Sequence, residues 1–157
     1  MTMQIEQDSA HVRIPPPLIL LSCVLLGAGL HWIFPVYFAR ESIRWPAAGI
    51  LILTGVSVIL YCAWNFRKRG TNIEPWKKTS HLITSGIYRL SRNPIYVSFV
   101  IVGLGVAFAV NSVWIALMMM PLMMIINRIV IAKEERYLEE RFGAEYLTYK
   151  EKVRRWI

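Results

Sequence analysis

Four long apolar stretches constrain the fold of this chain more than any other feature. They cover residues 18–38, 45–66, 95–110 and 112–132. A helix needs about 20 predominantly apolar residues to cross the hydrocarbon core of a bilayer, and a helix satisfies within itself the backbone groups that lipid cannot. The pattern therefore predicts an all-α integral membrane protein with about four transmembrane helices.

The composition agrees with a membrane protein. Of the 157 residues, 55% are hydrophobic and only 18% are charged. A soluble domain of this length could not bury so much apolar surface. We expect a single membrane domain over residues 1–157. Cys23 and Cys62 lie inside apolar stretches and no histidine-cysteine cluster occurs, so the sequence predicts no metal site and no disulfide.

Breaks in the apolar pattern predict where helices turn or bend. Asn111 and Ser112 are the only polar residues between the last two stretches, which predicts a tight helical hairpin there. The first stretch is interrupted by His31 and Pro35. Pro121 lies within the last stretch, where a missing N–H is expected to kink the helix.

The distribution of basic residues predicts the orientation in the membrane. The net charge is +8, and the segment 67–93 carries seven lysines and arginines against one acidic residue. Seven more basic residues follow Ala132, whereas the turn at 111–112 has none. Basic loops stay in the cytoplasm, so the charge indicates membrane orientation rather than a nucleic-acid partner. We expect a multi-pass inner-membrane protein with a tail over 1–17, a loop over 67–94 and a tail over 133–157, all cytoplasmic.

The tail over 133–157 has the pattern of amphipathic helices. Apolar and aromatic residues recur at three- and four-residue steps, at Tyr137, Leu138, Phe142, Tyr146, Tyr149 and Val153. Gly143 is expected to end one helix and let a second begin. Two compatible interpretations remain: a helix lying on the lipid headgroups, or a cover over a cytoplasmic pocket.

The segment 80–96 is the first candidate site, because it gathers hydroxyl, imidazole, guanidinium, amide and phenol groups within 17 residues. Pro94 at a helix start leaves nearby backbone donors free for an anion such as a carboxylate. Arg92 can add a charge-assisted fork. Tyr88 and Tyr96 can stack on an adenine or face a sulfonium cation. The alternative is a basic loop anchored at the headgroups.

Two further candidates lie on the last two apolar helices. Gly103 and Gly105 indicate either close helix packing or room for a ligand. Glu134 and Glu135 end the fourth stretch, where acidic residues oppose the helix dipole. They indicate either a ligand for an ammonium or hydroxyl group, or an interfacial set of salt bridges.

Residues seven positions apart share one face of an α-helix. On this basis Asn127 is expected beside Glu134, and Arg128 beside Glu135.

Taken together, these segments resemble the superfamily of isoprenylcysteine carboxyl methyltransferases and phospholipid N-methyltransferases. The resemblance covers about half of the chain, from Ser80 to Arg155. The matching residues are Leu82–Tyr88, Arg92–Tyr96, Gly103–Gly105, Glu134–Glu135, Phe142–Tyr146, Tyr149 and Val153–Arg154. Asn93 and Ile87 stand where many relatives have histidine and proline. Asparagine does not titrate, so a general base at position 93 is not expected.

The resemblance implies an S-adenosyl-L-methionine-dependent methyltransferase with a cytoplasmic cofactor pocket covered by the helical tail. It places cofactor contacts at His81, Leu82, Ile83, Gly86, Tyr88, Arg92, Asn93, Pro94, Tyr96, Gly103, Gly105, Glu134 and Glu135. Arg92 and Arg128 are the residues implied to contribute to catalysis. The partners are the bilayer and a hydrophobic or lipidated acceptor. A prenylcysteine carboxylate is the first acceptor implied, with a phospholipid amine or a small thiol as alternatives.

Two other classes of protein remain open. The superfamily shape also resembles the catalytic part of NADPH-dependent sterol reductases, although those chains are much longer. A non-enzymatic four-helix membrane protein, such as a cation exporter, is the other alternative. Exporters of that kind need a buried acid in a span, and the first three apolar stretches contain none.

Overall fold

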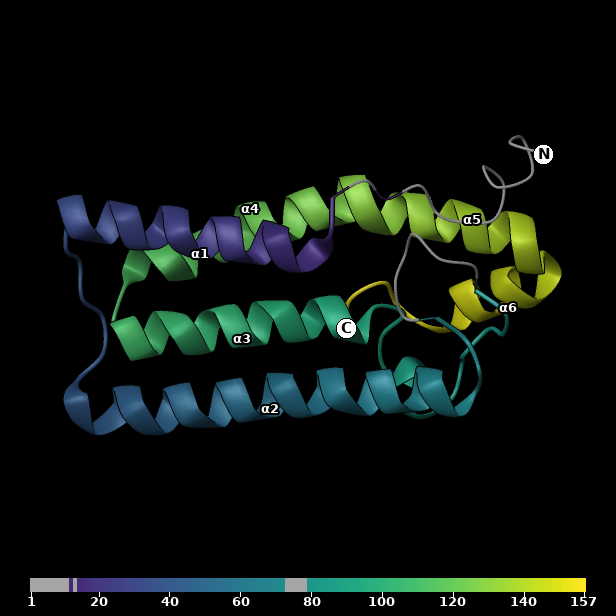
Figure 1. The fold of residues 1–157 in the computed structure, drawn as a ribbon, viewed down its shortest axis with the longest axis horizontal. Coiled ribbons are helices and arrows are strands. Elements are labelled where there is room, and N and C mark those ends of the chain that lie inside the picture. Colours follow the sequence, from purple (N-terminus) through teal and green to yellow (C-terminus); the bar gives the residue numbers. More distant parts are fainter. Residues whose placement is uncertain (1–11, 13, 73–78) are drawn as a thin grey trace. The chain divides into compact units, whose positions relative to one another are not determined.

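The structure is a computed structural model that describes residue 12 and residues 14–72 and 79–157. Throughout these residues the regular elements are helical, and no strand occurs among them (Figure 1). In chain order they are α1 (Pro16–Ile33), α2 (Glu41–Lys68), the 3₁₀ helix η1 (Gly86–Arg89), α3 (Pro94–Val110), α4 (Val113–Ile125), the π-helix η2 (Ile126–Ile131), α5 (Ala132–Phe142) and α6 (Ala144–Lys152). The predicted all-α fold is confirmed. Most of the expected tail over 1–17 lies outside the described residues.

Three helices are long and apolar enough to cross a membrane. They are Pro16–Ile33, Glu41–Lys68 and the continuous helix Val113–Phe142. The fourth apolar helix, α3, is shorter, at 17 residues. Proline at its first position fits a helix start, and Asn111, with a φ of 58°, stops it. The chain is thus a helical membrane protein, and its described residues include three helices of full spanning length and a shorter one.

Two helix boundaries differ from those that the apolar stretches predicted. α1 ends at Ile33 and not near Phe38, because Pro35 cannot donate a backbone hydrogen bond and disfavours helical geometry at Phe34. α2 begins at Glu41 and continues to Lys68, beyond the predicted 45–66. Hydropathy marks only the apolar part of a helix, whereas polar residues at both ends can extend it.

By their contacts the residues form two compact units. The helical unit comprises residues 14–58 and 96–126, and the polar unit comprises the described residues within 1–13, 59–95 and 127–157. The first holds the greater part of the apolar helices. The second holds most of the charged segments singled out in the sequence.

Within the helical unit, glycines allow the helices to approach closely. α1 runs along α4 (Figure 1), and a Cβ added at Gly27 would lie 2.8 Å from the Cα of Ile115. A Cβ at Gly105 of α3 would lie 2.7 Å from Ile52 Cγ1 of α2. Such contacts are the usual role of small residues in membrane helices. The space beside Gly105 is therefore occupied by a neighbouring helix.

The predicted hairpin turn at 111–112 is confirmed, and Asn111 also fixes the loop after α1. Its side-chain oxygen accepts hydrogen bonds from the backbone N–H groups of Phe38 at 3.0 Å and Ala39 at 2.9 Å, and its amide donates to Ala39 O at 2.8 Å. Asparagine tolerates the left-handed backbone conformation better than most residues. Ser112 then caps α4 by accepting a hydrogen bond from Ile115 N at 3.3 Å.

The helix that follows departs from α-helical geometry a few residues after Pro121, and a kink at Pro121 itself stays a prediction. Pro121 lies inside α4, and the departure comes after it, in the π-helix Ile126–Ile131. π-Helical segments are uncommon in proteins, and those that occur often lie at functional sites.

The close contact of α1 with α4 gives a direct test. We expect Gly27→Ala to lower the free energy of unfolding by about 1–3 kcal/mol, because the new methyl group meets the backbone of Ile115. Gly29→Ala is the matched control, since a Cβ at that position of the same helix meets nothing within 4 Å. Thermal unfolding in detergent compares the two variants. Equal melting temperatures would contradict this packing.

Candidate functional site

The polar unit is organised around the buried carboxylate of Glu135 on α5. The residue is 5% exposed. Its Oε1 accepts a hydrogen bond from Arg155 Nε at 3.0 Å, and its Oε2 accepts one from Arg155 Nη2 at 2.5 Å. Arg92 Nη1 lies 3.1 Å from the same Oε1. Both carboxylate oxygens are thus engaged by arginine.

Arg92 is the second buried charge of this cluster, with only 9% of its side chain exposed. Neither its Nε nor its Nη1 has a hydrogen-bond partner among the described residues. The 3.1 Å approach to Glu135 is therefore an ion pair without hydrogen-bond geometry. One carboxylate faces two guanidinium groups, so the cluster of these three residues has an excess positive charge. Buried donors without acceptors are costly, and an anionic ligand would satisfy them.

Arg155 is a residue of this cluster that the sequence did not predict. Besides its fork to Glu135, its Nη1 donates to Asn127 Oδ1 at 2.9 Å. Its backbone carbonyl accepts hydrogen bonds from Asn93 Nδ2 at 2.9 Å and from Ser91 Oγ at 3.3 Å. The sequence indicates only that a buried glutamate needs a cation as a partner. Any basic residue of the tail could be that cation, so the sequence does not single out Arg155.

The π-helix changes the spacing on which the expected pairs on one helix face depend, and the pairing of Asn127 with Glu134 stays a prediction. α-Helical spacing placed Asn127 beside Glu134, yet Asn127 and Glu135 converge on the same guanidinium of Arg155. A π-turn takes one more residue than an α-turn, which shifts the register by one position. Arg128, expected beside Glu135, has an exposed side chain and forms no ion pair with any residue that the structure describes.

Three buried tyrosines surround the cluster. Tyr149 Oη donates to the carbonyl of Tyr88 at 2.6 Å, and the ring of Tyr149 lies 6.1 Å from that of Tyr146. Burial, followed by the charge of Glu135, raises the pKa of Tyr146 to about 12. Burial also raises the pKa of Tyr88 well above its ordinary value. These phenols stay neutral at physiological pH and act as hydrogen-bond donors, not bases.

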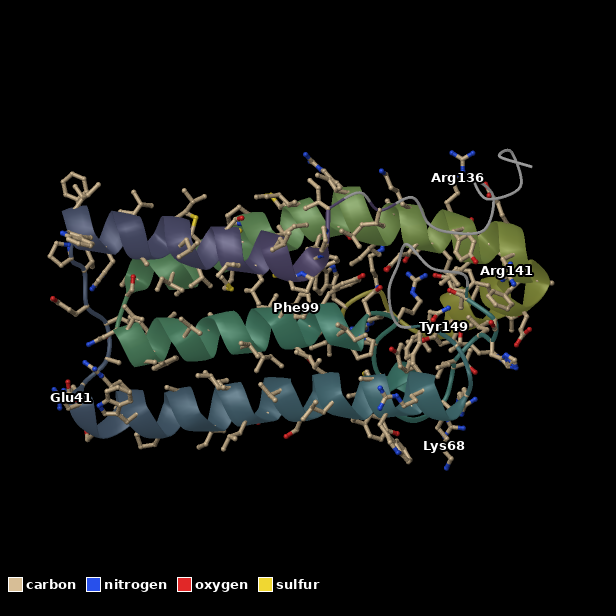
Figure 2. All side chains as sticks on the ribbon, viewed as in Figure 1. Glu41, Lys68, Phe99, Arg136, Arg141 and Tyr149 are labelled. Carbon is tan, nitrogen blue, oxygen red and sulfur yellow. The ribbon has the colours of Figure 1, made fainter. Side chains whose placement is uncertain are left out.

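Figure 2 shows the contrast between buried and exposed members of the tail. Tyr149 lies among the side chains of the polar unit, whereas Arg136 on α5 points away from them. Arg136 is paired with Glu140, at 2.9 Å on the surface of the same helix. The helices α5 and α6 meet at Gly143, whose φ of 52° ends one and begins the other as predicted.

The remaining predicted residues of the polar unit differ in exposure. Ile83 and Pro94 are buried, Leu82, Asn93 and Glu134 are half-buried, and His81 and Gly86 are exposed. Gly86 has a φ of 64°, and a Cβ there would lie 2.6 Å from Tyr61 Oη. Glu134 is close enough to Tyr88 to contribute to its raised pKa. Their contacts with a cofactor stay predictions.

Tyr96, Gly103 and Gly105 belong to the helical unit. Tyr96 is buried, and its ring lies 5.9 Å from that of Phe99. The space beside Gly103 is filled by Met119 and Leu20. The structure therefore favours the helix-packing interpretation of the two glycines, and contact of these three residues with a cofactor stays a prediction.

The fold and the site together define an all-α membrane protein whose polar unit holds a buried ionic cluster with excess positive charge. The sequence profile of the family described as phospholipid methyltransferase matches residues 43–145, which is more than half of the chain. The chain belongs to the phospholipid methyltransferase family.

Similarity to individual proteins is more limited. An uncharacterized protein of Haemophilus influenzae is 59% identical over 34 residues, which make up 22% of this chain and 54% of that protein. The chain thus spans about half the length of this curated relative. No solved structure is significantly similar to the chain.

The raised pKa of Tyr146 predicts how stability depends on pH. An unfolded tyrosine ionises near pH 10 and the folded one near 12, so the stability that this group contributes is present below pH 10 and is lost as the pH rises toward 12. We expect the free energy of unfolding in detergent to decline less steeply for Tyr146→Phe than for the wild type between pH 10 and 12. Parallel curves for the variant and the wild type would contradict the burial of a neutral phenol.

Proposed function

We propose that this protein is an S-adenosylmethionine-dependent methyltransferase that acts on a lipidic acceptor at the cytoplasmic membrane surface. Family membership supports methyl transfer. The observation that carries the proposal is Arg92, a buried guanidinium whose Nε and Nη1 lack hydrogen-bond partners in a cluster with excess positive charge. The amino-acid part of S-adenosylmethionine has a carboxylate that fits these donors.

The cofactor-binding roles follow from the charge and chemistry of each group. We assign the carboxylate of the cofactor to Arg92, because a guanidinium forms short, charge-assisted bonds with carboxylates. Glu134, which is half-buried and close enough to Tyr88 to raise its pKa, is assigned to the ammonium group or the ribose hydroxyls. Glu135 has both oxygens bound to arginine, so its role is to hold the arginines and not to contact the cofactor directly.

Methyl transfer from a sulfonium needs positioning more than acid-base chemistry. S-Adenosylmethionine supplies, when bound, a methyl group on a positively charged sulfur. The acceptor's lone pair forms the new bond to the methyl carbon while the carbon–sulfur bond breaks and its electrons stay on sulfur. A carboxylate acceptor releases no proton, and an amine must only arrive unprotonated. Orientation and exclusion of water are the contributions expected of the protein, and its neutral tyrosines and the amide of Asn93 are suited to them.

Arg128 supports an anionic, lipidic acceptor. Its guanidinium is exposed on η2, within the continuous helix Val113–Phe142 that is long enough to span the bilayer. An exposed guanidinium can bind a carboxylate or a phosphate. The resemblance in sequence favours a prenylcysteine carboxylate, and the description of the matching family favours a phospholipid amine as the second candidate.

Transfer of radiolabelled methyl groups tests the proposed activity. We expect purified protein in detergent to bind S-adenosylhomocysteine and to label a prenylcysteine or a phospholipid. Arg92→Gln should weaken binding of S-adenosylhomocysteine roughly tenfold or more, because a hydrogen bond to a charged group is lost. Arg89→Gln, which removes an exposed arginine from η1, is the matched control. Wild-type protein that neither binds the ligand nor labels either acceptor would reject the function.

Arg128 should affect the acceptor and not the cofactor. We expect Arg128→Ala to raise the KM for the lipidic acceptor about tenfold, since one charge-assisted contact is removed, with unchanged affinity for S-adenosylhomocysteine. Arg136→Ala removes another exposed arginine, whose surface pair with Glu140 contributes little, and serves as the control. An unchanged KM for every acceptor tested would rule out contact between Arg128 and the acceptor.

A further inference from the structure

We infer that Arg155 is a positioning residue for the methyl-transfer site, which keeps Glu135 from neutralising Arg92 so that Arg92 stays available to a ligand carboxylate. This inference rests on the proposed function. It assigns a specific task to the segment after α6, which carries Arg155 beyond the last helical residue, Lys152.

The first support is the way in which Arg155 occupies Glu135. Its Nε and Nη2 bind the two carboxylate oxygens as a planar fork, and its Nη1 binds Asn127 Oδ1 at 2.9 Å. Both oxygens of Glu135 are thereby satisfied without a hydrogen bond from Arg92. A bidentate fork fixes orientation in a way that a lysine cannot reproduce.

The second support is the backbone of the same residue. The carbonyl of Arg155 accepts hydrogen bonds from Asn93 Nδ2 at 2.9 Å and Ser91 Oγ at 3.3 Å. These two residues flank Arg92 in the loop before α3. One residue thus holds α5 through its side chain and the Arg92 loop through its backbone, and it sets the distance between the two charges.

The physical reason for the inference is competition for Arg92. Without the fork, the carboxylate of Glu135 would be buried with one guanidinium left, 3.1 Å away and with two unsatisfied nitrogens. A buried carboxylate takes whatever donors are within reach, so Glu135 would turn to Arg92. It would then occupy the donors that the proposed function assigns to the cofactor. Loss of Arg155 should therefore weaken binding of the cofactor, because Glu135 would then occupy Arg92.

This competition predicts whether a second substitution raises or lowers the affinity of an Arg155 variant for S-adenosylhomocysteine. We expect Arg155→Ala to weaken the affinity for S-adenosylhomocysteine by about ten- to a hundredfold, the range typical for groups that orient a ligating side chain. Adding Glu135→Gln to Arg155→Ala should restore affinity about tenfold, because a neutral amide cannot neutralise Arg92. Arg155→Lys should give an intermediate affinity. A purely structural role for Arg155 predicts that the double variant binds no more tightly than Arg155→Ala.

Isothermal titration of the full chain in detergent, with thermal unfolding recorded for each variant, measures these effects. Lys152→Ala is the control, since it removes an exposed basic residue three positions earlier. The role of Arg155 is overturned, while the proposed function stands, if Arg155→Ala binds S-adenosylhomocysteine as tightly as Lys152→Ala does. It is also overturned if the double variant binds S-adenosylhomocysteine no more tightly than Arg155→Ala. Wild-type protein that binds no S-adenosylhomocysteine overturns both.

Discussion

A carboxylate that is almost fully buried cannot remain charged unless cations reach it, and this requirement at Glu135 organises the polar unit. Arg92 and Arg155 meet at its two oxygens. They come from a loop before α3 and from the end of the chain, so the ion cluster joins segments that are far apart in sequence. Asn93 and Asn127 complete the connection by bonding the backbone and the side chain of Arg155.

The charge of this cluster is also what suits it to a methyl donor. Two guanidinium groups and one carboxylate leave an excess positive charge, and two nitrogens of Arg92 lack acceptors among the described residues. The neighbouring phenols do not offset it, because burial raises the pKa values of Tyr88 and Tyr146. An amino-acid carboxylate would complete the cluster, while the reaction itself needs no titrating base near neutral pH.

In the helical unit, glycines allow the helices to pack closely. Gly27 and Gly105 bring helices into contact, and Asn111 fixes the loop between α1 and α2. In lipid these close contacts replace the hydrophobic effect as the source of helix association. The neighbours of Gly103 and Gly105 favour helix packing for these glycines, and their contact with a cofactor stays a prediction.

The sequence by itself determined the helical membrane fold, the hairpin at Asn111 and the break at Gly143, and it marked Arg92 and Glu135 as candidate site residues. Each of these follows from local chemistry: apolar length, a tolerated positive φ, or a charge where burial is costly. The tertiary structure alone revealed that Arg155 binds both Glu135 and Asn127. Periodicity assumes α-helical geometry, which the π-helix Ile126–Ile131 breaks. Arg155 reaches Glu135 because the segment after α6 folds back toward α5. No local sequence pattern encodes that long-range contact.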